Sequence, residues 1–345
     1  MNKFSVYQHW DPLKVCIVGR SYSPDFYSFI SSPKVRSIFE KIATETEEDY
    51  QKLIKLLKSF NVDVLRPDID LDFALERSGT KYKQPPMNPR DYGGMFGETF
   101  YFDIYQREYE SIIKKVSQTN EVKHTELINT AITTRVGKDL YIGTKANADY
   151  NGGDIEDPKQ YALQNDKEWS ALDNEFKTKY RTHWVDTEGH ADGCFCPVVP
   201  GLIITRSDMR SYSDTFPDWE IVQIDSSYHQ KLKSFKQMKR KNEGKWWVKG
   251  EEFNDEFIEF IDSWVSHWVG FVDETIFDVN ILMIDQKNAA VNGYNKKVYS
   301  AMERHGVTPH LVKFRHRFFW DSGLHCVTQD LDREGILEDF FPYRG

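Results

Sequence analysis

The sequence predicts an α/β protein, because short runs typical of β-strands alternate with helical patterns along its 345 residues. No Pro/Gly/Ser-rich linker and no internal repeat divides the chain. The composition, 39% hydrophobic and 14% aromatic, is sufficient for a substantial core. A single domain spanning residues 1–345 is the simplest organisation that fits these observations.

Seven short segments rich in apolar and β-branched residues are predicted as strands. Helical spacing of apolar residues predicts a helix over 45–60, directly before the strand that begins at 62, and another over 294–305, before the strand that begins at 309. This alternation defines the fold class but does not specify how the strands are arranged. The predicted strands are residues 15–18, 62–65, 140–142, 201–205, 220–224, 279–284 and 309–312.

Two polar stretches interrupt the alternation and are predicted as insertions. Residues 154–181 are charged and carry no clear strand pattern. Residues 230–269 begin with a basic run at 233–242 and continue into an amphipathic, tryptophan-bearing helix over 252–269. The basic run could contact phosphate, but acidic residues follow it, so a solvated helix face is the better interpretation.

Composition and charge exclude several classes of protein. With 45 basic and 54 acidic residues the net charge is −9, which argues against nonspecific binding to nucleic acid. Four cysteines are too few for a disulfide scaffold in a chain of this length. The N-terminus has no signal-peptide pattern, and no apolar run approaches membrane-spanning length. The expected compartment is a reducing cytoplasm, in which a free thiol survives.

The strongest chemical signal lies near the C-terminus, where Cys326 follows Gly323-Leu-His. Far upstream, the segment Gly189–Gly201 contains His190 and Asp192. A thiol, an imidazole and a carboxylate can together attack a guanidinium or acyl carbon, provided that a nearby cation favours the thiolate. Side chains alternate along a strand, so His190 and Asp192 are predicted to share one face. An ordinary buried His–Asp pair is the alternative.

Two further patterns carry side chains suited to a site. His190, Cys194, Cys196 and Cys326 could together bind zinc. The Cys-x-Cys spacing disfavours this, and no Cys-x-x-Cys pair occurs, so no metal is predicted and Cys194 and Cys196 are expected to be small buried residues. The proline-rich segment Pro85–Asp91 ends in a carboxylate suited to presentation into a cleft, although Arg-Asp pairs are common in loops.

Five segments, taken in order, resemble the amidinotransferase family, which is related to arginine deiminases and dimethylarginine hydrolases. The last two are the most specific, and the five together span nearly the whole chain apart from the two insertions. The resemblance implies a five-bladed, pseudo-symmetric α/β propeller of ββαβ modules around a polar channel that holds the active site. The segments are His9–Gly19, Met87–Asp91, Ile128–Asp139, His190–Gly201 and the run from Phe277 through Cys326 to Gly335.

The resemblance also implies a mechanism. Cys326 attacks the guanidinium carbon of L-arginine, and a covalent amidino-cysteine forms. His190 protonates the leaving amine and then deprotonates an acceptor amine, for which glycine is one candidate. Asp91 and Asp192 bind the planar guanidinium, because its fork of N–H donors requires paired acceptors.

One position departs from the family pattern. Where the family has an acidic residue that accepts a hydrogen bond from the catalytic histidine, this chain has Asn129. An amide oxygen can fix the imidazole tautomer but cannot stabilise the imidazolium by charge, so Glu126 is an alternative for that role. The resemblance assigns further substrate contacts to Asp278 and to Arg210, with Arg206 as the alternative to Arg210.

The expected function is therefore transfer of an amidino group from L-arginine to an amine, without cofactor or metal. A guanidine hydrolase, in which water replaces the amine, is one alternative. A catalytically quiet guanidinium-binding protein is the other; Asn129 keeps it open, whereas the thiol of Cys326 argues against it. The expected partners are small molecules, not nucleic acid or membrane. A homodimer is common in the resembled family, but no residue here indicates one.

Overall fold

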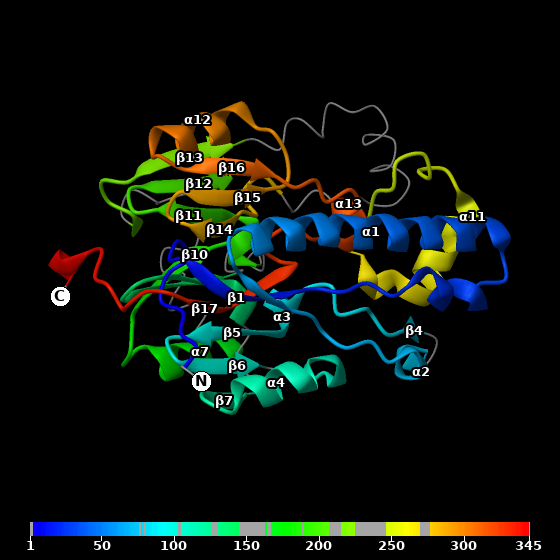
Figure 1. Cartoon of the computed structure of the whole chain (residues 1–345), viewed down its shortest axis with the longest axis horizontal. Coiled ribbons are helices and arrows are strands. Elements are labelled where there is room, and N and C mark those ends of the chain that lie inside the picture. Colours follow the sequence, from blue (N-terminus) through cyan, green and yellow to red (C-terminus); the bar gives the residue numbers. More distant parts are fainter. Residues whose placement is uncertain are drawn as a thin grey trace.

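The computed structural model describes the chain in several stretches. Its strands form small separate sheets, with helices at the periphery (Figure 1). The α/β class predicted from the alternating pattern is therefore confirmed. The described residues are 3–75, 77–78, 81–102, 105–125, 130–144, 163, 167–187, 190–206, 215–224, 246–269 and 277–344.

Five sheets in the described stretches have three strands each and share one pattern. In each sheet the central strand pairs antiparallel with one neighbour and parallel with the other. A smaller sheet pairs β3 (Arg77–Ser78) with β4 (Lys81–Tyr82). The five sheets, with the central strand in the middle, are β17 (Thr328–Arg333), β1 (Leu13–Val18), β2 (Asp63–Leu65); β5 (Gly93–Phe96), β6 (Thr99–Phe102), β7 (Glu121–His124); β8 (Thr133–Val136), β9 (Asp139–Thr144), β10 (Arg181–Asp186); β11 (Phe195–Val199), β12 (Leu202–Arg206), β13 (Glu220–Ile224); and β14 (Leu282–Asp285), β15 (Asn288–Val291), β16 (Thr308–Leu311).

Helices connect the parallel strands, which a tight turn cannot join. Helix α1 (Pro33–Ser59) connects β1 to β2, α4 (Glu110–Val116) connects β6 to β7, and α7 (Lys167–Phe176) connects β9 to β10. Helix α12 (Lys296–Arg304) connects β15 to β16. This order is that of a ββαβ module, whereas the arrangement of five such modules around a channel stays a prediction. The shorter helices are α2 (Leu71–Ala74), α3 (Pro89–Tyr92), α11 (Asp255–Phe260) and α13 (Arg317–Trp320).

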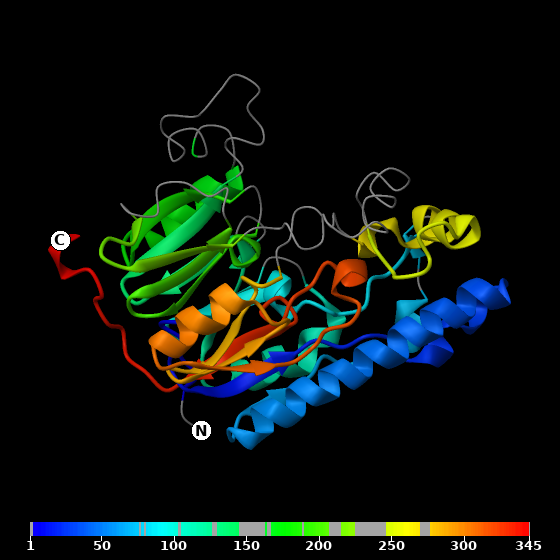
Figure 2. The ribbon, with the colours of Figure 1, turned by 90° about the horizontal axis from the view of Figure 1, so that it is seen from above.

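Helix α1 begins at Pro33, twelve residues before the predicted start. Ser32 caps it by accepting a hydrogen bond from the N–H of Val35 (3.3 Å), and proline suits the first helical position. The buried face of α1 packs on the sheet of β1 and on α11, where the rings of Phe39 and Phe257 lie 5.3 Å apart. Figure 2 shows α1 running along one side of the molecule.

Each of the seven predicted strands overlaps a strand of the structure. The pattern misses other strands, among them β5, β11 and β17, which are buried along almost their whole length. A strand buried on both faces shows no alternation of polar and apolar residues. In β17 the buried residues include Gln329 and Asp330, so its polar sequence conceals a core strand.

The two predicted insertions are described in part. Within 154–181, the structure describes α7, which lies between the paired strands β9 and β10, and the first residue of β10. Within 230–269, α11 continues into a π-helical segment, Ile261–Val265, and a 3-10 turn, Ser266–Trp268, in place of one regular helix. The buried Trp268 of this segment donates a hydrogen bond to the carbonyl of Tyr82 (3.1 Å). The basic run at 233–242 lies outside the described residues.

A buried ion cluster ties β17 to α3 and β8. The carboxylate of Asp330 lies 2.8 Å from Nη1 of Arg90, 2.8 Å from Nε of Arg333 and 3.4 Å from Nη2 of Arg135. Burial alone would raise the pKa of Asp330, but the three guanidinium groups hold it well below its usual range. The cluster fixes the strand that directly follows the loop of Cys326.

Candidate active site

Cys326 lies in the loop between α13 and β17, and its side chain is buried. The backbone of this loop is attached to α3, because the N–H of Arg90 donates to the carbonyl of Cys326 (3.4 Å). Nε of Arg90 also donates to the carbonyl of His325 (3.3 Å). Because α3 carries Asp91 as well, these bonds set the position of that carboxylate relative to the thiol.

Asp192 contacts the thiol directly. Its Oδ2 lies 3.3 Å from Sγ of Cys326 and 2.8 Å from Nδ1 of His325. Burial alone would raise the pKa of Asp192, but the hydrogen bond from His325 and the charges of His325, His190 and Arg90 lower it to about 2. Burial and the charge of Arg90 in turn lower the pKa of His325. Asp192 is therefore an ionised carboxylate, whose Oδ2 accepts a hydrogen bond from Nδ1 of His325.

The prediction that His190 and Asp192 share one strand face is wrong. A 3-10 turn, Ala191–Gly193, follows His190, and β11 begins only at Phe195. The N–H groups of Gly193 and Cys194 close this turn on the carbonyls of His190 and Ala191. As a result His190 is exposed, whereas Asp192 is buried beside the thiol.

His190 reaches the site through Asp91. Its Nδ1 lies 3.5 Å from Oδ1 of Asp91, and both side chains are partly exposed. Burial raises the pKa of Asp91 to about 6; the charge of His190 opposes this rise, and the charge of Asp192 adds to it. The imidazole and the second carboxylate therefore shift the pKa of Asp91 in opposite directions. The resulting pKa of about 6 lies close to neutral pH.

Each carboxylate keeps one oxygen without a hydrogen bond. Oδ1 of Asp91 and Oδ1 of Asp192 are shielded from solvent, and neither accepts a hydrogen bond within the described stretches. Buried carboxylate oxygens are normally satisfied, so two such atoms at one site indicate a ligand that donates hydrogen bonds. Burial and the charges of Asp192 and Asp91 raise the pKa of Cys326 well above its usual range. The site therefore favours a cation and keeps the thiol protonated without one.

Other predicted residues are less well placed. Asn129, its alternative Glu126, and Arg210 lie outside the described residues. Asp278 accepts a hydrogen bond from Nδ2 of Asn295 (2.9 Å), the N-cap of α12. Arg206 is buried at the end of β12, with Nη1 3.8 Å from Sγ of Cys194.

The zinc ligands considered in the sequence are not assembled by the described part of the chain, where no group of three or more His, Cys, Asp or Glu residues could hold a metal ion. Cys194 and Cys196 are buried, as predicted. Among the described helices none is both long and apolar enough to cross a membrane.

The sequence did not single out three residues that surround the thiol. Asn280 donates from Nδ2 to Sγ of Cys326 (3.0 Å), His325 binds Asp192, and Arg90 anchors the loop. His325 adjoins Cys326 and Arg90 adjoins Asp91 in the sequence, so proximity was an available signal for both. Asn280 lies 46 positions from Cys326, and a lone asparagine in an apolar run carries no such signal.

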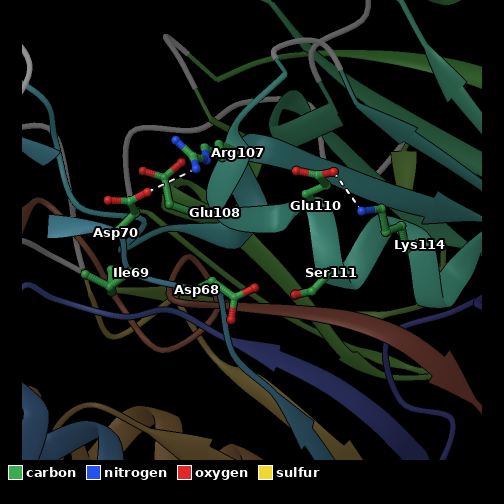
Figure 3. Close-up of a pocket in the computed structure, with 8 residues that line it drawn as sticks. All are labelled: Asp68, Ile69, Asp70, Arg107, Glu108, Glu110, Ser111 and Lys114. Carbon is green, nitrogen blue, oxygen red and sulfur yellow. Dashed lines mark ion pairs between the residues drawn. The ribbon is translucent and has the colours of Figure 1, made fainter. Parts of the chain in front are cut away.

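A hollow of about 340 Å³ lies away from Cys326, between the segment before α2 and the start of α4 (Figure 3). Two ion pairs form within it, Arg107 with Asp70 (3.2 Å) and Lys114 with Glu110 (2.8 Å), and Glu108 pairs with Lys83 outside it (2.6 Å). None of the predicted site residues lines it.

Comparison of the sequence with known proteins finds short matches. A stretch of 63 residues is 32% identical to mitochondrial glycine amidinotransferase of Xenopus laevis and covers 18% of this chain and 15% of that protein. A stretch of the same length is 33% identical to L-arginine:L-lysine amidinotransferase of Pseudomonas savastanoi pv. phaseolicola, covering 18% and 17%. The matches thus span less than a fifth of either relative. No protein-family model matches the chain.

Comparison of the structure covers the whole chain. The amidinotransferase SxtG of Microseira wollei, from saxitoxin biosynthesis, superposes with a TM-score of 0.65 at 16% identity over 98% of this chain and 99% of its own. Inosamine-phosphate amidinotransferase of Streptomyces griseus gives 0.64 at 16% identity over 99% of both chains. A dimethylarginine dimethylaminohydrolase gives 0.53 at 11% identity over 92% of this chain. The chain has the fold of these amidinotransferases, as the motifs in its sequence predicted.

Proposed function

We propose that the chain is an amidinotransferase that moves the amidino group of L-arginine to an acceptor amine through a covalent amidino-Cys326. The observation that carries the proposal is a pair of buried oxygens that accept no hydrogen bond within the described residues, Oδ1 of Asp91 and Oδ1 of Asp192, beside a buried thiol; Oδ1 of Asp91 has only the longer contact with Nδ1 of His190 (3.5 Å). A guanidinium group supplies a planar set of N–H donors and one positive charge, which is what two adjacent carboxylates require.

Binding of the guanidinium also activates the nucleophile. The pKa of Cys326 is raised by burial and by the two carboxylates, so a bound cation that neutralises them favours the thiolate. Activation and substrate binding are then one event, and the free protein keeps its thiol protonated.

The reaction follows in two displacements. The thiolate of Cys326 attacks the guanidinium carbon, the bond from that carbon to the ornithine nitrogen breaks, and His190 gives the leaving amine a proton. The acceptor amine then attacks the amidino carbon and passes a proton to His190, and the carbon–sulfur bond breaks to release the thiolate. Partial exposure of His190 suits this exchange, because both amines must reach it.

The remaining assignments belong to the same proposal. Asn129 would accept a hydrogen bond from His190, Arg210 or Arg206 would bind the α-carboxylate, and Asp278 would contact substrate. The five three-stranded sheets would be the blades of a propeller in one domain, residues 1–345, with insertions near 154–181 and 230–269. Glycine as the acceptor, a cytoplasmic location and a homodimer stay predictions.

A guanidine hydrolase is the second candidate, because the fold is shared with a dimethylarginine dimethylaminohydrolase. The test is incubation with L-arginine and a panel of amines, followed by product analysis. The transferase releases ornithine and a new guanidino compound, and only when an amine is present. Citrulline formed from arginine alone and undiminished by amines would contradict the transferase and support the hydrolase. Arginine binding without any product would identify a catalytically quiet protein.

A further inference from the structure

The side-chain amide of Asn280 is fully buried and uses all of its hydrogen-bonding capacity. Its Oδ1 accepts from the backbone N–H groups of His325 (2.7 Å) and Cys326 (3.1 Å). Its Nδ2 donates to Sγ of Cys326 (3.0 Å) and to the carbonyl of Asp192 (3.1 Å). The side chain of Asn280 therefore contacts the sulfur of Cys326, the backbone of the loop that carries it, and the backbone of Asp192.

The orientation of this amide is determined by its partners. Two backbone N–H groups converge on one atom of the amide, and only the oxygen can accept from both. The flipped amide would direct its NH₂ group at two donors and its oxygen at the carbonyl of Asp192. The Nδ2–H group of the Asn280 side chain therefore points at the sulfur of Cys326.

The surrounding chain holds Asn280 in place. Its backbone N–H donates to the carbonyl of Phe277 (3.2 Å), and its carbonyl accepts from Nδ2 of Asn292 (3.2 Å). Gly323 leaves the space that the amide occupies, because a Cβ atom there would lie 2.3 Å from Oδ1 of Asn280. Neither the backbone nor the neighbouring loop allows the amide to turn away from the sulfur.

We infer that Asn280 is a catalytic residue, whose Nδ2–H group donates a hydrogen bond to the thiolate of Cys326 while its Oδ1 fixes the loop that presents this thiolate. The inference rests on the proposed function only in taking Cys326 as the nucleophile. A hydrogen bond to a charged sulfur is stronger than one to a neutral thiol, so the amide favours ionisation. This hydrogen bond thus opposes the effect of Asp192, whose Oδ2 contacts the same sulfur atom and disfavours its ionisation.

The test is the pH dependence of Cys326 alkylation by iodoacetamide, mapped by peptide mass spectrometry. In Asn280→Asp the oxygen that accepts from the loop remains, an oxygen replaces the donor that faces the sulfur, and the added negative charge acts on the thiol in the same direction. The midpoint of alkylation is expected to rise by about one pH unit or more, so the rate at a fixed pH below it falls at least about tenfold. Near-ultraviolet circular dichroism and the thermal midpoint show whether the variant is folded.

Asn120→Asp is the matched control. Asn120 is also buried; its Oδ1 accepts from the backbone N–H of Phe4 (3.1 Å) and its Nδ2 donates to the carbonyls of Phe4 and Glu98 (2.8 Å each), away from the sulfur of Cys326. Its alkylation midpoint is expected to stay at the wild-type value. A folded Asn280→Asp protein with an unchanged midpoint, or equal shifts in both variants, would overturn the inference.

A measurement on the unsubstituted chain avoids any failure of Asn280→Asp to fold. In protein labelled with ¹⁵N-asparagine, one Nδ2 signal should shift with the same midpoint as Cys326 alkylation and lose this dependence in Cys326→Ala. The absence of such a signal would contradict the inference. Neither readout requires an amidino donor. If the role of Asn280 is confirmed but arginine is not turned over, the proposed function is contradicted while the inference about Asn280 stands.

Discussion

Oδ2 of Asp192 lies 3.3 Å from Sγ of Cys326, so a carboxylate touches the atom that the proposed reaction makes negative. In the free protein this contact opposes ionisation of the thiol. In the proposed reaction the same carboxylate attracts the guanidinium, whose charge reverses the effect on the thiol. Asp192 therefore has two opposite consequences that single substitutions can separate.

Replacement of Asp192 by Asn should lower arginine affinity and raise the reactivity of the thiol. Loss of a charge-assisted hydrogen bond costs about 1.5–3 kcal/mol, which corresponds to roughly 10- to 100-fold in the dissociation constant. Removal of the adjacent charge should move the alkylation midpoint of Cys326 to lower pH. Calorimetric titration with arginine and iodoacetamide kinetics measure the two effects. If the arginine affinity and the reactivity of the thiol both fall, the carboxylate acts only through folding.

Arginine affinity should depend on the ionisation of Asp91. The pKa of Asp91 is raised to about 6 in the free protein, and a bound guanidinium lowers it. The dissociation constant should therefore increase by about tenfold for each pH unit below this pKa. Titrations between roughly pH 5 and pH 8, where proteins tend to be most stable, measure the slope. In Asp91→Asn the affinity should be lower by about one to two decades, and this slope should disappear.

The cluster around Asp330 should dominate the stability of the site. Asp330→Asn leaves three buried guanidinium groups without their carboxylate, and loss of one partner of a buried pair costs about 3–5 kcal/mol. Urea unfolding measures the change. Asp332→Asn, on the same strand, is the control, because its Oδ1 accepts only from the N–H of Ser5 and it is half buried. Equal losses of unfolding free energy in the two variants would show that the three buried arginines do not need the carboxylate of Asp330 for stability.

The sign of the pH effect follows from the lowered pKa of Asp330. A carboxylate whose pKa is lower in the folded state stabilises the protein at every pH above its unfolded value, about 3.9, and loses this effect as the pH falls toward the folded value. The free energy of unfolding in the wild type should therefore receive its full contribution from Asp330 at neutral pH. The difference in the free energy of unfolding between wild type and Asp330→Asn should become smaller as the pH falls into the acid range.

The motifs predicted which residues would meet, but not how. The structure brings Cys326, Asp192, Asp91 and His190 to one site from segments far apart in the chain. The rule of alternating strand side chains failed at His190, because the chain makes a 3-10 turn before β11 begins. Period-two reasoning applies only within a strand, and no residue in the sequence marked where this strand starts.

Strands with an apolar pattern were predictable, and strands that form the interior of the site were not. β17 carries Gln329, Asp330 and Arg333 into the core, where ion pairs replace apolar contacts. Asn280 was missed for a related reason: its importance comes from four hydrogen bonds that exist only in the folded chain. Periodicity and spacing describe burial along one segment and carry no information on partners from another segment.

The most direct test of the account is the mass of the protein after incubation with L-arginine in the absence of an amine. The account predicts an added amidino group that maps to Cys326, disappears when an acceptor amine is added, and does not form in Cys326→Ser. An adduct on Cys194 or Cys196, with Cys326→Ser still active, would contradict it.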